Sequence, residues 1–110
     1  MNYVNENGLD PIQVMHLNRI QVKDMDELTK TVGWQQLCVF LDAELAAIVR
    51  AMDSATTGDM ALKATAAFTA LKQIRYFPDA TRNASIKRIQ ELEKEALEVE
   101  KKPSPRNRMP

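Results

Sequence analysis

The clearest pattern in the chain is an amphipathic stretch between residues 33 and 53, GWQQLCVFLDAELAAIVRAMD. At about 100° per residue, its apolar side chains fall in a stripe roughly 120° wide on one side of a helix. The stripe contains Trp34, Leu37, Cys38, Leu41, Leu45, Ile48, Val49 and Met52. The segment that follows, DSATTGD, is typical of a loop, and either Thr57 or Asp59 can cap a further helix.

A second helix is predicted from about Met60 to Phe77, because a proline at position 78 disfavours helical geometry in the residue before it. Its apolar positions recur at alternating steps of four and three residues. They are Met60, Ala64, Ala67, Leu71 and Ile74. Alanines at such positions allow two helices to approach closely. The two helices and their short connection predict an antiparallel hairpin over residues 34–77.

The register of this hairpin predicts one ion pair. Asp42 and Arg75 fall on the same flank, and Arg75 lies at the edge of its apolar stripe, where an unpaired charge would be costly. We therefore expect the two side chains to lie within about 6 Å of each other, the range over which such charges interact.

The segments that flank the hairpin have weaker patterns. Residues 1–23 are predicted to form an N-terminal arm, either a short helix starting at Asp10-Pro11 or an extended segment. The spacing of Asp24 and Glu27 is that of a capping box, which predicts a short helix through about Val32. After the hairpin, Asn83 or Ser85 can cap a long helix over residues 83–102.

The apolar stripe of this last helix consists of Ile86, Ile89, Leu92, Ala96 and Val99. Residues 103–110 follow as a basic, proline-containing tail. The sequence therefore predicts an all-α fold, in which an antiparallel helical hairpin is flanked by a short N-terminal helix or arm and a long C-terminal helix. The helical domain is expected to span residues 24–102.

The composition narrows the classes of function. Fifteen basic and fifteen acidic residues cancel, so the net charge does not steer the chain towards nucleic acid or membranes. A single cysteine excludes an intramolecular disulfide and fits a reducing compartment. The N-terminus lacks the pattern of a signal peptide, and Asp42 and Glu44 interrupt the most apolar region, so we expect no membrane span. These features favour a soluble protein of the cytoplasm.

No constellation for catalysis is present. His16 is the only histidine, which excludes a pair of histidine ligands, and Gly8, Gly33 and Gly58 are isolated rather than part of a phosphate loop. Cys38 lies in the apolar stripe and is interpreted as a packing residue. We therefore expect a protein that is not an enzyme and that uses no metal, cofactor or small-molecule substrate.

Binding residues are expected where side chains remain outside the helical stripes. Phe40, Val39, Leu62, Tyr76 and Phe77 are such residues, and a hairpin plus one helix cannot easily cover them all; of these, Phe40, Tyr76 and Phe77 are the predicted contact residues. Ordering each residue costs on the order of 1.5 kcal/mol, so a thin, alanine-rich core favours self-association or a larger protein partner. The basic C-terminus, with Lys101, Lys102, Arg106 and Arg108, is either a solubilising end or an electrostatic anchor for phosphates or an acidic surface.

Residues 33–78 resemble small helical-hairpin proteins of tailed bacteriophages. The resemblance is carried by a Trp-x-x-Leu helix start at Trp34, the acidic centre LDAEL, a short polar turn, and the close TALKQIRYFPD. It implies an accessory of the virion or of head assembly, with no catalytic residues to carry over. Two hypotheses follow. The first is a non-enzymatic structural protein that docks on larger subunits or on other copies of itself. The alternative is a small regulator that binds nucleic acid or a host protein through its basic C-terminus.

Overall fold

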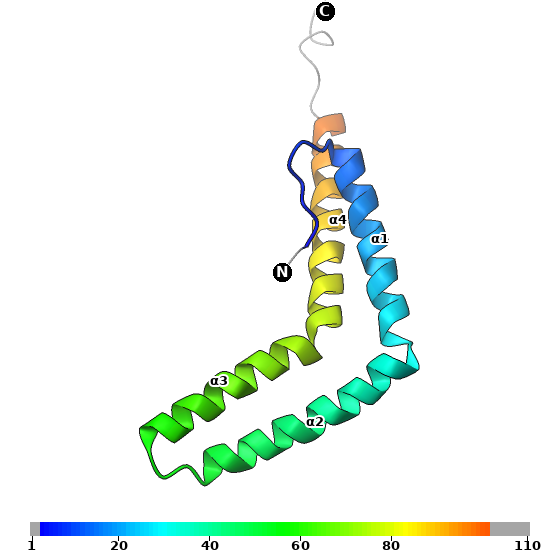
Figure 1. Ribbon diagram of the computed structural model, residues 1–110. Coiled ribbons are helices and arrows are strands. Elements are labelled where there is room, and N and C mark those ends of the chain that lie inside the picture. Colours follow the sequence, from blue (N-terminus) through cyan, green and yellow to red (C-terminus); the bar gives the residue numbers. More distant parts are fainter. Residues whose placement is uncertain (1–2, 102–110) are drawn as a thin grey trace, which may run out of the picture. The chain divides into compact units, whose positions relative to one another are not determined.

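The structure is a computed structural model that describes residues 3–101, with Lys101 described by its backbone alone, and this part of the chain is all-α (Figure 1). It contains four helices, α1 (Pro11–Thr29), α2 (Val32–Asp53), α3 (Gly58–Arg75) and α4 (Phe77–Lys101). The chain forms two compact units, with boundaries after Asp24 and after Ala80. The inner unit contains α2 and α3, which pack against each other as the predicted antiparallel hairpin.

Helix α1 starts where the Asp10-Pro11 dipeptide predicts a start. The backbone N–H of Gln13 donates to Asp10 Oδ1 at 2.9 Å, and the backbone N–H of Asp10 donates to Gln13 Oε1 at 3.0 Å. This reciprocal arrangement is a capping box that satisfies two orphan N–H groups. The helix then continues to Thr29, so the predicted new start at Asp24 is wrong. An acid followed by Glu at the third position is also compatible with a helix interior when the preceding residues are already helical.

The residues before α1 form a turn and a short non-helical segment. The backbone N–H of Leu9 donates to the carbonyl of Glu6 at 3.1 Å, and Gly8 has a φ of 75°. Turns with a positive φ at the third position favour glycine, because other residues pay a steric cost there. The turn leads the chain from the segment containing Glu6 into α1.

Threonines cap both helices of the hairpin. Thr31 Oγ1 accepts from the backbone N–H of Trp34 at 3.2 Å at the start of α2, and Thr57 Oγ1 accepts from the backbone N–H of Met60 at 3.2 Å at the start of α3. Of the two caps that the sequence allows for α3, Thr57 is therefore the one used, and Asp59 lies in the first turn. An acid in this position interacts favourably with the helix dipole.

Helix α4 begins six residues earlier than predicted, at Phe77 instead of residue 83. Only Tyr76 separates it from α3, and the backbone N–H of Ala80 donates to the carbonyl of Tyr76 at 2.9 Å. Pro78 is tolerated in the first turn of a helix, where its missing N–H would have no partner in any case. The same proline that ends α3 therefore also starts α4.

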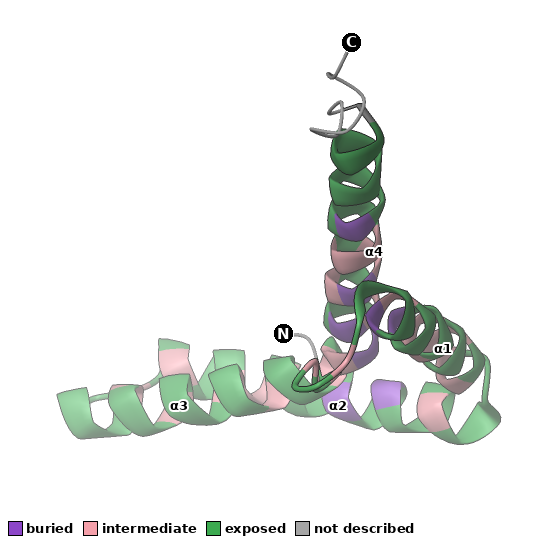
Figure 2. Cartoon of the chain, turned by 90° about the horizontal axis from the view of Figure 1, so that it is seen from above, coloured by how far each residue is buried: buried purple, intermediate pink, exposed green. Residues whose placement is uncertain are grey.

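The described residues bury few side chains, as the colouring of Figure 2 shows. The buried apolar ones are Val14, Cys38, Leu41, Pro78 and Leu92. Three further buried side chains are polar, namely Asn18, Thr81 and Ser85. Much of the apolar surface of the helices is therefore left outside any core.

Candidate interaction surfaces

The two helices of the hairpin contact each other through one row of side chains each, which we call the inward positions. In α2 these buried or half-buried residues are Trp34, Cys38, Leu41, Leu45, Ile48 and Met52. In α3 they are Ala61, Ala64, Phe68, Leu71 and Arg75. Both rows alternate steps of three and four residues, the spacing of two helices that pack lengthwise. Six of the eight residues of the stripe predicted from the sequence are in this row, including the buried Cys38, whereas Leu37 and Val49 are exposed.

The row in α3 differs from the prediction. Met60, Ala67 and Ile74 were expected to face α2, but all three are exposed. The residues directly after them, Ala61, Phe68 and Arg75, lie at the inward positions instead. Phe68 buries much more apolar surface than Ala67, and Arg75 reaches an acid on α2, so this rotation of α3 by about 60° is favoured. It leaves Met60 and Ile74 without cover from the hairpin.

The predicted ion pair between Asp42 and Arg75 is present. Arg75 Nε donates to Asp42 Oδ1 at 2.8 Å, and Arg75 Nη2 donates to Asp42 Oδ2 at 3.5 Å. This hydrogen bond raises the pKa of the Arg75 guanidinium above its ordinary value. The arginine also lies over the ring of Tyr76, with 5.4 Å between the guanidinium carbon and the ring centroid. The pair ties the middle of α2 to the end of α3.

A position directly before an inward position defines one face of the hairpin. In two antiparallel helices packed along a common line, such positions lie on the same side of the pair, and positions directly after the inward ones lie on the other side. We call the first side the apolar face. Its apolar side chains are Leu37 (42% exposed), Phe40 (58%), Met60 (50%) and Ile74 (49%), together with the exposed alanines Ala67 and Ala70.

The opposite side of the hairpin is mostly polar. The residues there include Asp42, Thr65 and Lys72, which all directly follow an inward position. Val39 (72% exposed), Leu62 (71%), Tyr76 (46%) and Val49 (43%) also follow inward positions, and polar residues alternate with them along both helices. The hairpin therefore has one extended apolar face and an opposite, more polar side that also carries apolar side chains.

The outer unit has a polar contact between its helices. The Asn18 side chain is fully buried, and its Nδ2 donates to the carbonyl of Val14 at 2.7 Å. Gln21 Nε2 donates to the hydroxyl of Ser85 at 2.7 Å, and Ser85 is also fully buried. No buried side-chain nitrogen or oxygen in residues 3–101 lacks a hydrogen-bond partner. The contact between α1 and α4 thus depends on matched polar groups.

Because of this contact, the stripe predicted for the last helix is only partly correct. Leu92 is buried, but Ile86 and Ile89 are half-buried, and Val99 is exposed. The most buried positions of α4 in this unit are instead Thr81 and Ser85. Small hydroxyl side chains let the helices approach closely while they supply hydrogen bonds, and apolar periodicity alone does not detect them.

Arg88 gathers three acids in the outer unit. Its Nη2 lies 2.9 Å from Glu6 Oε1, and its Nη1 lies 3.3 Å from Glu91 Oε2 and 3.9 Å from Glu95 Oε1. The hydrogen bond with Glu6 is the main cause that raises the pKa of Arg88. This cluster connects the segment before α1 to α4, two parts of the chain that are far apart in sequence.

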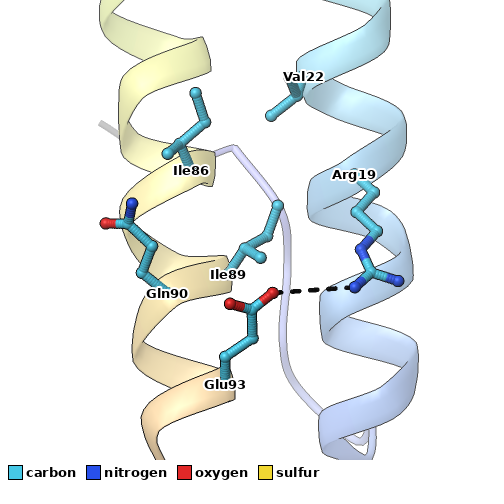
Figure 3. A pocket seen from close by; sticks show the side chains of 6 residues that line it. All are labelled: Arg19, Val22, Ile86, Ile89, Gln90 and Glu93. Carbon is cyan, nitrogen blue, oxygen red and sulfur yellow. Dashed lines mark ion pairs between the residues drawn. The ribbon is translucent and has the colours of Figure 1, made fainter.

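A shallow groove of about 330 Å³ lies between α1 and α4 (Figure 3). Val22 contributes from α1, whereas Ile86 and Ile89 contribute from α4. Arg19 and Glu93 approach to 4.0 Å at its edge, and both side chains are largely exposed, so this pair contributes little to stability. The groove is open and apolar with one polar edge, which suits contact with a macromolecule better than enclosure of a small one.

The predicted binding residues differ in how exposed they are and in whether the structure describes them. Phe40 and Tyr76 are exposed, whereas Phe77 is half-buried at the start of α4. Lys101 is the last residue of α4, and its side chain is not described. The remaining predicted residues, Lys102, Arg106 and Arg108, lie outside the described residues. The structure therefore supports an accessible surface at the hairpin and leaves the basic tail as a prediction.

Reactive side chains are dispersed over the described residues. His16 is exposed on α1, and Cys38 is buried in the hairpin. Within residues 3–101, no three histidine, cysteine or acidic side chains are grouped so that they could hold a metal ion.

Helix α2 is long and apolar enough to cross a membrane by length and composition alone. This corrects the expectation that Asp42 and Glu44 exclude such a helix. A helix that is apolar on more than one side is also typical of one buried between protein neighbours. Each acid at the centre of a bilayer would cost about 2.5 to 3.5 kcal/mol.

Comparisons of the chain with protein-family models, with curated proteins and with solved structures find no match.

Proposed function

We propose that this chain is a non-enzymatic interaction protein that serves as a structural or assembly component. The observation that carries the proposal is the apolar face of the hairpin, with Leu37, Phe40, Met60 and Ile74 between 42% and 58% exposed. Grouped apolar side chains on a soluble surface mark sites of contact with other macromolecules. The resemblance of residues 33–78 to hairpin proteins of tailed bacteriophages supports a place in a virion or in head assembly.

The small core supports the same role. In the hairpin, only Cys38 and Leu41 are buried apolar side chains, and α3 contributes none. A helical pair with so little burial gains stability when other protein subunits cover it. Such a protein acts by adding surface to an assembly, and its folding and its binding are linked.

Co-purification tests this proposal. The full chain, tagged and expressed in cells that contain the assembly, should be recovered in a fixed ratio to larger subunits. Phe40→Glu and Ile74→Glu should reduce this recovery at least tenfold, because each places a charge on the apolar face. Val39→Glu is the matched control, since Val39 is more exposed than Phe40 but lies on the polar side of α2.

Two outcomes would contradict the structural role. Recovery of the chain without larger subunits at any ratio is one of them. The other is binding to nucleic acid that falls steeply with salt and disappears when residues 102–110 are removed, which would favour the regulatory alternative.

A further inference from the structure

We propose that the apolar face of the hairpin binds the same face of a second copy of this chain, so that two α2–α3 hairpins form an antiparallel four-helix bundle. The inference rests on the interaction role proposed above, and it names the occupant of that surface. The carrying observation is that one side of the hairpin combines exposed Leu37, Phe40, Met60 and Ile74 from both helices with small residues, whereas the apolar residues on the other side alternate with polar ones.

The pattern of this face is the first argument. On both helices, the positions of this face are the ones directly before each inward residue. On α2 these positions are Leu37, Phe40, Glu44, Ala47 and Ala51, and on α3 they are Met60, Lys63, Ala67, Ala70 and Ile74. In a four-helix bundle each helix must present two adjacent apolar rows, one to each neighbour. Both α2 and α3 have this second row, and within the hairpin it has no neighbour to cover it.

The size of the face is the second argument. Helix α3 has 18 residues, and at 1.5 Å per residue a helix of that length is roughly 27 Å long. Two helices of roughly 10 Å diameter side by side give a face of roughly 500 Å² per copy, or roughly 1,000 Å² for two copies. Specific interfaces begin at about that area. Contact along the full hairpin is therefore enough for a dimer, whereas contact with a single short helix would bury half as much.

Charge is the third argument. The face carries one acid, Glu44 on α2, and one base, Lys63 on α3. Two identical faces with one charge of each sign carry no net charge, so they do not repel each other as two faces of like charge would. Large side chains at one end of the row in α2 and alanines at the other also suit a twofold arrangement that sets α2 over the partner's α3, because the long Met60 side chain then meets the small Ala51.

The oligomeric state of the purified full chain tests the proposal. Sedimentation equilibrium should show a dimer that dissociates on dilution. Phe40→Glu and Ile74→Glu should each weaken the dimer by about 30-fold or more, as expected for a charge at the centre of an interface. Val39→Glu and Leu62→Glu place the same charge on the same helices at positions that are 72% and 71% exposed on the other side. These two controls should dissociate as the wild type does.

A measurement on the wild type alone covers the case in which a variant fails to fold. The midpoint of thermal unfolding should rise with protein concentration, since dimerisation stabilises only the folded chain. The proposal is overturned if the wild type is a monomer at about 100 μM, a hundredfold above a micromolar dissociation constant. It is also overturned if the control variants weaken the dimer as much as Phe40→Glu does, or if a monomeric chain floats with lipid vesicles.

A monomer that still co-purifies with larger subunits would leave the proposed function standing, whereas a dimer that recovers no subunits would contradict the function alone.

Discussion

Asp42 and Arg75 join the two helices of the hairpin through two hydrogen bonds, at 2.8 Å and 3.5 Å. The residues are 33 positions apart, so the pair reports directly on the register of α2 against α3. Arg75 is the charged member of the row of inward residues on α3, and the other residues of that row are apolar or small. The strength of the pair is limited, because 57% of the Asp42 side chain is exposed to solvent.

Asp42→Asn should lower the free energy of unfolding by about 0.5 to 1 kcal/mol, the range for an accessible ion pair with good geometry. Urea unfolding followed by circular dichroism measures the change. Arg75→Met and the double variant complete a thermodynamic cycle, which isolates the interaction from the cost of each single change. A coupling energy of zero would show that the contact does not contribute to stability.

The contribution of this pair should not change between pH 7 and pH 10. The hydrogen bond to Asp42 raises the pKa of Arg75 in the folded chain. A raised pKa on a basic group gives stability that is fully present below the ordinary pKa of that group and is lost only as the pH rises through the raised value. The ordinary pKa of arginine and the raised pKa of Arg75 both lie far above this window. The difference in unfolding free energy between wild type and Asp42→Asn, measured at three pH values in the window, should therefore be constant. A loss of the difference near pH 8 would contradict the assignment.

The sequence was sufficient to predict the hairpin because its information is local and periodic. The stripe on α2 and the caps around residue 57 follow from spacing alone, and the Asp42–Arg75 pair follows from the register that the short loop imposes. The rotation of α3 was not predictable in this way. Its alanine-rich surface offers two similar rows, and only the competition between Phe68 and Ala67 for the contact with α2 decides between them.

The contact between α1 and α4 could not be predicted, for a different physical reason. It depends on buried hydrogen bonds between residues far apart in the chain, such as Gln21 and Ser85, and polar residues carry no apolar period. The apolar face of the hairpin was not predicted either, because it includes residues that were expected to face α2. Met60 and Ile74 were expected inside the hairpin, and their exposure became visible only with the structure.

Replacing Ser85 should test the polar contact. Ser85→Ala removes the hydroxyl that accepts from Gln21, and we expect a loss of about 1 kcal/mol in the free energy of unfolding, the usual contribution of such a bond. Ser85→Val should cost about 1 to 3 kcal/mol, because the site is fully buried and has no space for two methyl groups. Asn83→Ala, two residues away at an exposed position of the same helix, should change stability by less than about 0.5 kcal/mol. Equal effects of the three variants would indicate that helix propensity, and not the contact, determines stability.

Cys38 offers a probe of the hairpin that needs no substitution. Its thiol is buried between the helices, next to the inward residue Leu41 along the row. A thiol reagent can therefore reach it only when the hairpin opens, and the labelling rate in native buffer should be at least about 100-fold slower than in denaturant. Leu41→Ala removes a buried side chain in the same row, which costs about 2 to 5 kcal/mol, so it should accelerate labelling strongly. Val39→Ala changes an exposed side chain beside the same cysteine and should leave the rate within a few-fold of the wild type. If labelling of the wild type were as fast as labelling of the unfolded chain, α2 and α3 would not be packed through their inward positions in solution.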